Sequence, residues 1–191
     1  MNNKDASWPH GYKQITQQNW LEPDMPFYFP NISPETWIHV SLEPQLVATV
    51  PNDIASLFEV ARAAIIQSWF FYPLLTLGAE QLNRVQETAA RERCRQLKIL
   101  PVKLIKSGRR KGQTTEPNFK ELIDALKTHG NMTASEYVRW NAARKLRNLS
   151  SHPNRQSIYS PGMANRSLKS TAELINKLFE PLAFTKSKEA S

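Results

Sequence analysis

Residues 144–153 hold the side chains of this chain that are best suited to chemistry on a phosphate. They read Arg-Lys-Leu-Arg-Asn-Leu-Ser-Ser-His-Pro. On a helix, Arg147 and Ser151 are four residues apart, and so are Asn148 and His152. Residues at this spacing are neighbours on a helix surface, so the four side chains form one polar patch in two adjacent columns.

This patch has the groups needed to bind and act on a phosphate. Arg147 offers a planar guanidinium that is always charged, and His152 can give or take a proton near neutral pH. Pro153 ends the helix at or before His152, and a helix C-terminus favours a protonated imidazole. Asn148 is placed to orient either Arg147 or His152. The alternative is structural: Arg147 pairs with a nearby acid, and His152 ends a helix ahead of a proline.

The overall charge agrees with a polyanionic partner. The chain of 191 residues carries a formal net charge of +8, which favours nucleic acid or an acidic protein, although a merely soluble basic surface explains it equally well. Cys94 is its one cysteine, so an internal disulfide framework and a cysteine-rich zinc site are excluded. We expect a reducing, cytoplasmic setting. Residues 1–13 lack the apolar core of a secretory signal, and the most apolar stretch, 61–77, is too interrupted to span a membrane.

A second basic cluster lies outside the patch. Between residues 99 and 117 the sequence predicts a loop that would grip an RNA backbone, with a flexible solvated loop as the alternative. Two further cations precede Arg147 by about one helical turn and could add phosphate contacts. The predicted RNA-binding residues are Lys106, Arg109, Arg110, Lys111, Arg144 and Lys145. His10, His39 and His129 are scattered without metal-ligand spacing, so we expect no metal and no cofactor.

The patch must be positioned by a bundle of helices. Apolar residues at spacings of three and four predict helices after Pro51, over about 74–97 and 119–128, from Thr133 to the patch, and from Pro161 onward. Asn52 or Asp53 can cap the first of these, Thr133 and Glu136 form a capping box, and Ser160-Pro161 is a good start for the last. The predicted fold is all-α: an antiparallel bundle of four to five helices.

The helix that carries the patch has two sets of apolar residues. Val138, Ala142, Leu146 and Leu149 follow a spacing of three or four and are predicted to be its core-facing stripe. Tyr137 and Trp140 are also interpreted as core. Arg147 and His152 lie outside the stripe of Val138, Ala142, Leu146 and Leu149, so their replacement should leave the fold intact.

The first 50 residues differ from the rest. They are rich in proline and aromatic residues, which predicts an irregular segment packed on the helical body, with a strand or two near residues 38–42. The predicted organisation is this segment at 1–50, a helical domain at 51–184, and a frayed polar tail at 185–191. Residues 69–72, Trp-Phe-Phe-Tyr, are interpreted as packing or as a dimer interface, because their apolar surface exceeds what one small bundle covers.

The motif and its place in the predicted bundle resemble the HEPN superfamily. Members carry an Arg-x4–6-His motif, often with a polar residue after the Arg, on a helix followed by a loop and one last amphipathic helix. Here the motif reads Arg147-Asn148-x-x-x-His152, and the resemblance covers about residues 52–183.

The resemblance implies a homodimer with motifs facing a shared cleft and, in many members, a metal-independent ribonuclease that acts as a toxin or antiphage effector. Arg147 would hold the scissile phosphate, His152 would be the acid or base for attack by the 2′-hydroxyl, and Asn148 would orient one of them. The alternative is a non-catalytic module that binds a nucleotide or an acidic protein partner such as an antitoxin.

Overall fold

The computed structural model describes residues 13–24, 32–104, 107, 109, 112–150 and 159–180, with 103 and 148–150 described by backbone alone. Within these ranges the chain is a helical bundle with a single two-stranded ladder. The predicted all-α fold is confirmed. The elements are α1 (Pro34–Leu42), α2 (Asn52–Gln67), α3 (Pro73–Gln96), β1 (Lys103–Leu104), β2 (Thr114–Thr115), α4 (Phe119–Thr128), α5 (Ala134–Ser150) and α6 (Pro161–Phe179).

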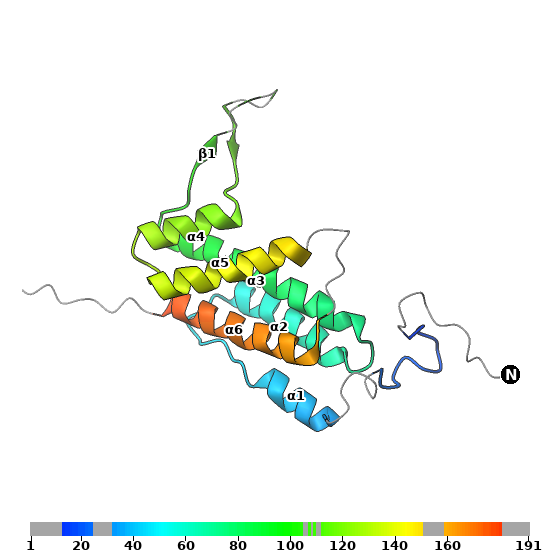
Figure 1. Cartoon of the computed structure of the whole chain (residues 1–191). Helices are drawn as coiled ribbons and strands as arrows, with labels where there is room; N and C mark the ends of the chain where they lie inside the picture. Colours follow the sequence, from blue (N-terminus) through cyan, green and yellow to red (C-terminus); the bar gives the residue numbers. More distant parts are fainter. Residues whose placement is uncertain are drawn as a thin grey trace, which may run out of the picture.

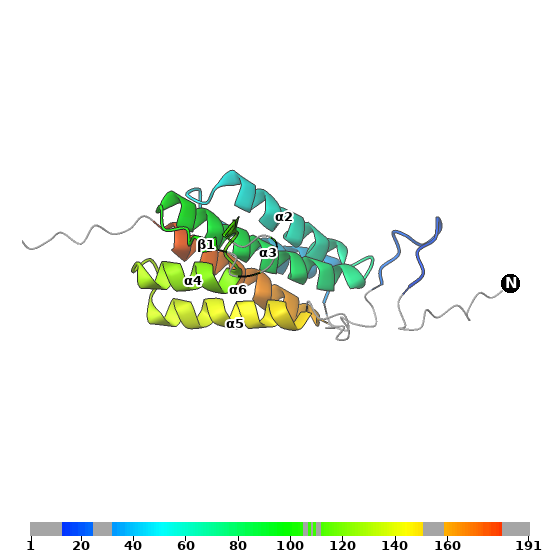
Figure 2. The same cartoon turned by 90° about the horizontal axis from the view of Figure 1, so that it is seen from above.

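Helix α3 lies at the centre of the bundle. It contacts α2, α4, α5 and α6. Its most extensive contact is with α2, with which it forms a hairpin. Helices α4 and α5 run side by side on one side of α3, and α1 lies against α2 and α6 (Figures 1 and 2). No helix in the described part of the chain is long and apolar enough to cross a membrane.

Local capping explains where the last three helices begin. The predicted capping box forms at α5, where Thr133 N–H donates to Glu136 Oε2 at 2.7 Å and Glu136 N–H donates to Thr133 Oγ1 at 3.2 Å. The predicted start of α6 is also confirmed, because the Ser160 side chain accepts from the Met163 N–H. A second capping box, Asn118 with Glu121, begins α4 and was not predicted.

Two predictions about the N-terminal half are wrong. Asn52 and Asp53 do not cap α2, because Pro51 occupies the cap position and makes no side-chain hydrogen bond there. The strand expected near residues 38–42 is the helix α1. Ser33 caps this helix by accepting from the Thr36 N–H, and Pro34 is its first residue. Proline at this position costs no helical hydrogen bond, which is why the helix begins here.

Helix α1 joins the core through Trp37. This side chain is fully buried, and its indole Nε1 donates to the backbone oxygen of Ile65 on α2 at 3.2 Å. The apolar core therefore extends from the first 50 residues into the bundle.

The basic segment before α4 forms an antiparallel pair, with Lys103 opposite Thr115 and Leu104 opposite Thr114. This β1–β2 pair projects away from the helices as an arm (Figure 1). Thr114 and Thr115 are exposed, so the arm contributes little to the core.

The contact between α2 and α3 is tightest at Gly78. A Cβ built on Gly78 would lie 2.6 Å from Ile65 Cγ1 and 2.9 Å from the backbone oxygen of Ala61. Real carbon atoms do not approach so closely, so a larger residue here would push the two helices apart.

We therefore expect Gly78→Ala to lower the free energy of unfolding by about 1–3 kcal/mol in a urea titration, because overpacking outweighs the better helix propensity of alanine. Gly162→Ala is the matched control, since the nearest atom to its added Cβ is the end of the Arg166 side chain at 3.8 Å. Equal stability of the two variants would contradict this account of the α2–α3 contact.

Candidate functional site: the end of α5

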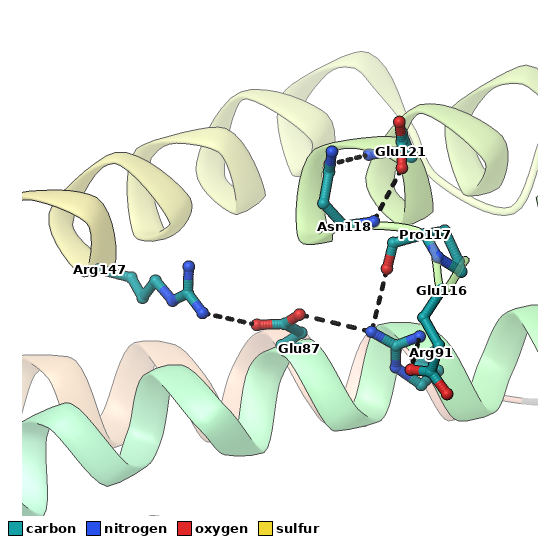
Figure 3. Close-up of polar contacts among 7 residues, drawn as sticks. All are labelled: Glu87, Arg91, Glu116, Pro117, Asn118, Glu121 and Arg147. Atoms are coloured by element: carbon teal, nitrogen blue, oxygen red, sulfur yellow. Dashed lines mark hydrogen bonds and ion pairs between the residues drawn. The ribbon is translucent and has the colours of Figure 1, made fainter. Parts of the chain in front are cut away.

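Arg147 lies near the C-terminal end of α5 and faces α3. It follows Trp140 by seven residues, or two helical turns, so both lie on the same face of the helix. Its Nη2 donates to Oε2 of Glu87 at 3.3 Å, and its side chain remains 44% exposed (Figure 3). The structural alternative named for Arg147, pairing with an acid, is therefore realised, but at the edge of solvent.

Glu87 links Arg147 to a longer chain of charges. It is 23% exposed and lies 3.5 Å from Nη2 of Arg91, one turn further along α3. Arg91 in turn contacts Glu116 at 2.8 Å and donates to the Pro117 backbone oxygen at 3.0 Å. Figure 3 shows this chain running from α5 across α3 to the residues before α4. The motif is thereby connected to the base of the β1–β2 arm.

The other predicted site residues are placed only in part. Arg144 is half-buried, and its Nε donates to Asn141 Oδ1 at 3.3 Å; Lys145 is exposed on the same last turns of α5. Arg109 is exposed on the arm. The backbone of Asn148 belongs to α5. The side chain of Asn148, together with Ser151, His152, Lys106, Arg110 and Lys111, lies outside the described residues.

The predicted core stripe of α5 is wrong at Val138, Ala142 and Leu146, and the side chain of its fourth residue, Leu149, lies outside the described residues. Val138 is 66% exposed and Leu146 is 53% exposed, and Ala142 is exposed as well. The inward face is instead the one that carries Tyr137 and Trp140, as the second interpretation held. Trp140 is 1% exposed and packs edge-on against Phe119 of α4, with ring centroids 6.1 Å apart.

The size of Trp140 explains this choice. A buried tryptophan removes more apolar surface from water than any single residue of the predicted stripe, and Trp140 packs against Phe119 of α4, so the face that carries it turns inward. Arg147 shares that inward face, which is why it reaches Glu87. The stripe of Val138, Ala142 and Leu146 is left on the outside.

A groove that the sequence did not indicate lies on the other side of α5, between α3, α5 and α6. Its volume is about 390 Å³. Small residues of α5 and α6, such as Ala142 and Ser167, keep it open. Its further lining includes Leu82 and Gln86 of α3, Leu146 and Arg139 of α5, and Met163 and Arg166 of α6.

The aromatic turn 69–72 does not provide the exposed surface expected of a dimer interface. None of its four side chains is exposed, and Tyr72 is 4% exposed. The N-terminal segment covers the turn: the Tyr72 N–H donates to Asp24 Oδ2, and the Asp24 N–H donates to the Trp69 backbone oxygen, both at 2.9 Å. Within the chain the turn packs against the N-terminal segment, and Trp69, Phe70 and Phe71 remain half-buried.

No group of three or more metal-binding side chains occurs in the part of the chain that the structure describes. Cys94 is buried and free. Burial raises the pKa of its thiol to about 11, although Arg91 opposes that shift, so this thiol is not a nucleophile near neutral pH.

Comparison with known proteins gave no matching family, no similar curated protein and no similar solved structure.

The two faces of α5 can be distinguished by stability. We expect Trp140→Ala to lower the free energy of unfolding by about 3–5 kcal/mol, because it leaves a cavity beside Phe119. Leu146→Ala, at an exposed position of the same helix, should change it by less than about 0.5 kcal/mol. Urea titrations of both variants provide the measurement, and a larger loss for Leu146→Ala would restore the stripe that the sequence predicted.

Glu87 should compete with any phosphate that binds Arg147. Glu87→Gln keeps the shape of the side chain but removes its charge, so we expect a short labelled RNA to bind severalfold more tightly in fluorescence anisotropy at low salt. Glu92→Gln is the control, because Glu92 lies on the same helix and pairs with Arg95 instead. An unchanged or weaker affinity for Glu87→Gln would contradict competition between Glu87 and a phosphate for Arg147.

Proposed function

We propose that this protein binds RNA and cleaves it without a metal ion, with Arg147 and His152 as the catalytic pair. The observation that carries the proposal is the position of Arg147. Its guanidinium is held by Glu87 at the solvent edge of the bundle, three residues before the end of α5. The segment that carries His152 follows directly in the chain.

The charge of α5 supports a phosphate ligand. Of its ionisable residues, four are basic (Arg139, Arg144, Lys145 and Arg147) and one is acidic (Glu136), which gives a net charge of 4 − 1 = +3. Three of the four cations lie in the last two turns. Such a cluster attracts a polyanion and binds it in a salt-dependent manner.

In the proposed reaction, His152 accepts the proton of the 2′-hydroxyl, whose oxygen then attacks the neighbouring phosphorus. The bond from phosphorus to the 5′-oxygen breaks, that oxygen takes a proton from water as it leaves, and His152 returns its proton to the solvent. The products are a 2′,3′-cyclic phosphate and a 5′-hydroxyl end. Arg147 stabilises the negative charge that builds up on the phosphoryl oxygens, and Asn148 orients the substrate or His152.

The resemblance to the HEPN superfamily extends the proposal. By this resemblance the protein would be a homodimer that acts as a toxin or antiphage effector, and the single cysteine agrees with a cytoplasmic setting. Arg109, exposed on the arm, would be a further RNA contact. The exposed stripe of Val138, Ala142 and Leu146 offers an apolar surface for such a dimer, next to Arg147 in the chain.

A second candidate is a non-catalytic module of the same superfamily that binds a nucleotide or an acidic protein partner. The ion pair between Arg147 and Glu87 favours it, because an arginine already neutralised by a carboxylate needs no substrate to be satisfied. The two candidates differ in whether RNA is cut.

The test is an incubation of purified protein with single-stranded RNA in the presence of a chelator. We expect wild type to produce cyclic-phosphate ends. Arg147→Ala should lose most of the activity, because no other residue of the motif offers a planar guanidinium to the phosphate. His152→Ala should lose as much, because the neighbouring Ser150 and Ser151 cannot exchange protons near neutral pH.

Both variants should stay folded. In Arg147→Ala, Glu87 keeps its second partner Arg91, so the loss of the partly exposed Arg147–Glu87 pair should cost only about 0–1 kcal/mol. Lys169→Ala, at an exposed position of α6, is the control. Equal cleavage by wild type and both variants would assign any nuclease activity to a contaminant.

A further inference from the structure

A second hollow, the arm-base cleft, lies where the β1–β2 arm joins α3. Its volume is about 330 Å³. Two arginines of α3 and two threonines of β2 line it together with a largely apolar remainder: Arg91, Arg95, Thr114, Thr115, Leu100, Pro101, Val102, Glu116 and Pro117. Guanidinium, hydroxyl and aliphatic groups therefore meet in one cleft.

The part of the chain that builds the cleft and the arm is strongly basic. Residues 91–117 contain nine basic and two acidic residues, a net charge of 9 − 2 = +7, whereas the whole chain carries +8. Nearly all of the excess positive charge is thus concentrated in this one segment. Such a concentration attracts a polyanion.

The two arginines of the cleft differ in what they can bind. The Arg91 side chain is 17% exposed and is held by two carboxylates and by the Pro117 backbone oxygen. The Arg95 side chain is 55% exposed, and its ion pair with Glu92 spans 3.6 Å at the surface. A surface pair of this kind contributes little to stability, so Arg95 can exchange its carboxylate for a phosphate. Arg91 instead fixes the position of the segment that follows the arm.

The cleft is connected to the motif through Glu87. This carboxylate contacts Arg147 at 3.3 Å and Arg91 at 3.5 Å, and Arg91 lines the cleft (Figure 3). Arg95 lies one helical turn beyond Arg91, which places it about 12 Å from Glu87 along the axis of α3. A single strand of a few nucleotides spans this distance. A strand with a phosphate at Arg147 therefore reaches Arg95.

We infer that the arm-base cleft binds the backbone of the RNA strand whose scissile phosphate lies at Arg147, with the Arg95 guanidinium as the ligand of a second phosphate. This inference rests on the proposed function and adds the path of its substrate. Thr114 and Thr115 supply hydroxyl donors for the same backbone. Contacts of guanidinium and hydroxyl groups to phosphate position a strand without reading its bases, so this binding is independent of sequence.

The experiment measures the binding of a labelled RNA octamer by fluorescence anisotropy at several salt concentrations. The octamer carries 2′-O-methyl groups, so it has no free 2′-hydroxyl and is not cleaved. We expect Arg95→Ala to bind it severalfold more weakly than wild type. The slope of log affinity against log salt should become shallower by about 0.7, the change expected when one phosphate contact to a single strand is lost. Arg95→Lys keeps the charge and should retain most of the affinity and the slope.

Arg166→Ala is the matched control. Arg166 is an exposed arginine of α6 that does not line the cleft, so its loss removes the same charge from another part of the surface. We expect this variant to keep the affinity and the salt slope of wild type. Circular dichroism verifies that each variant is folded.

The outcomes separate the two proposals when Arg147→Ala is measured in the same assay. If Arg147→Ala weakens binding and Arg95→Ala does not, or if Arg95→Ala and Arg166→Ala weaken it equally, the cleft is wrong and the proposed function stands. One strand that contacts both arginines gives one octamer per chain at saturation, and two octamers per chain would contradict the shared path. If wild type does not bind the octamer, both the proposed function and the cleft are overturned.

Discussion

The close contact between α2 and α3 at Gly78 is the constraint on which the rest of this molecule depends. Without a side chain at this position, the backbone of α3 packs directly on Ala61 and Ile65 of α2. With one face of α3 covered in this way, its other faces are left for α4, α5 and α6. Helix α3 is consequently buried along most of its length, and its polar residues are available to the surrounding helices. Gln86 lines the groove, and the adjacent Glu87 pairs with Arg147.

Local signals predicted most of the fold. The bounds of α4 and the start of α6 follow from periodicity and from side chains that cap the helix within three residues. The failure at α1 is instructive, since Ser33-Pro34 is the same type of start as Ser160-Pro161. The many prolines around α1 favoured an irregular segment. A proline in the first turn of a helix, however, favours the start of that helix.

The site was predictable as residue types but not as geometry. Arg147 and Glu87 are 60 residues apart, and no local pattern indicates that α5 places one beside the other. Periodicity indicated two apolar faces on α5 and did not show which one faces the core. In the structure the face that carries the large side chain of Trp140 is the buried one. The groove could not be predicted from the sequence, because it is the space that the small side chains of α5 and α6 leave between these helices and α3.

Glu87 allows Arg147 to exchange a carboxylate for a phosphate at a low cost in free energy. A half-buried carboxylate left alone would be strongly destabilising, because burial penalises its charge. Glu87 avoids this by contacting two guanidiniums, Arg147 at 3.3 Å and Arg91 at 3.5 Å. If a phosphate takes Arg147, Glu87 keeps Arg91, which is itself held by Glu116 and by the Pro117 backbone oxygen. The carboxylate therefore orients Arg147 in the free protein without having to be left unpaired when the ligand binds. This arrangement reconciles the ion pair with the proposed role of Arg147, since the pair that neutralises the arginine also places it at the surface where a phosphate can reach it.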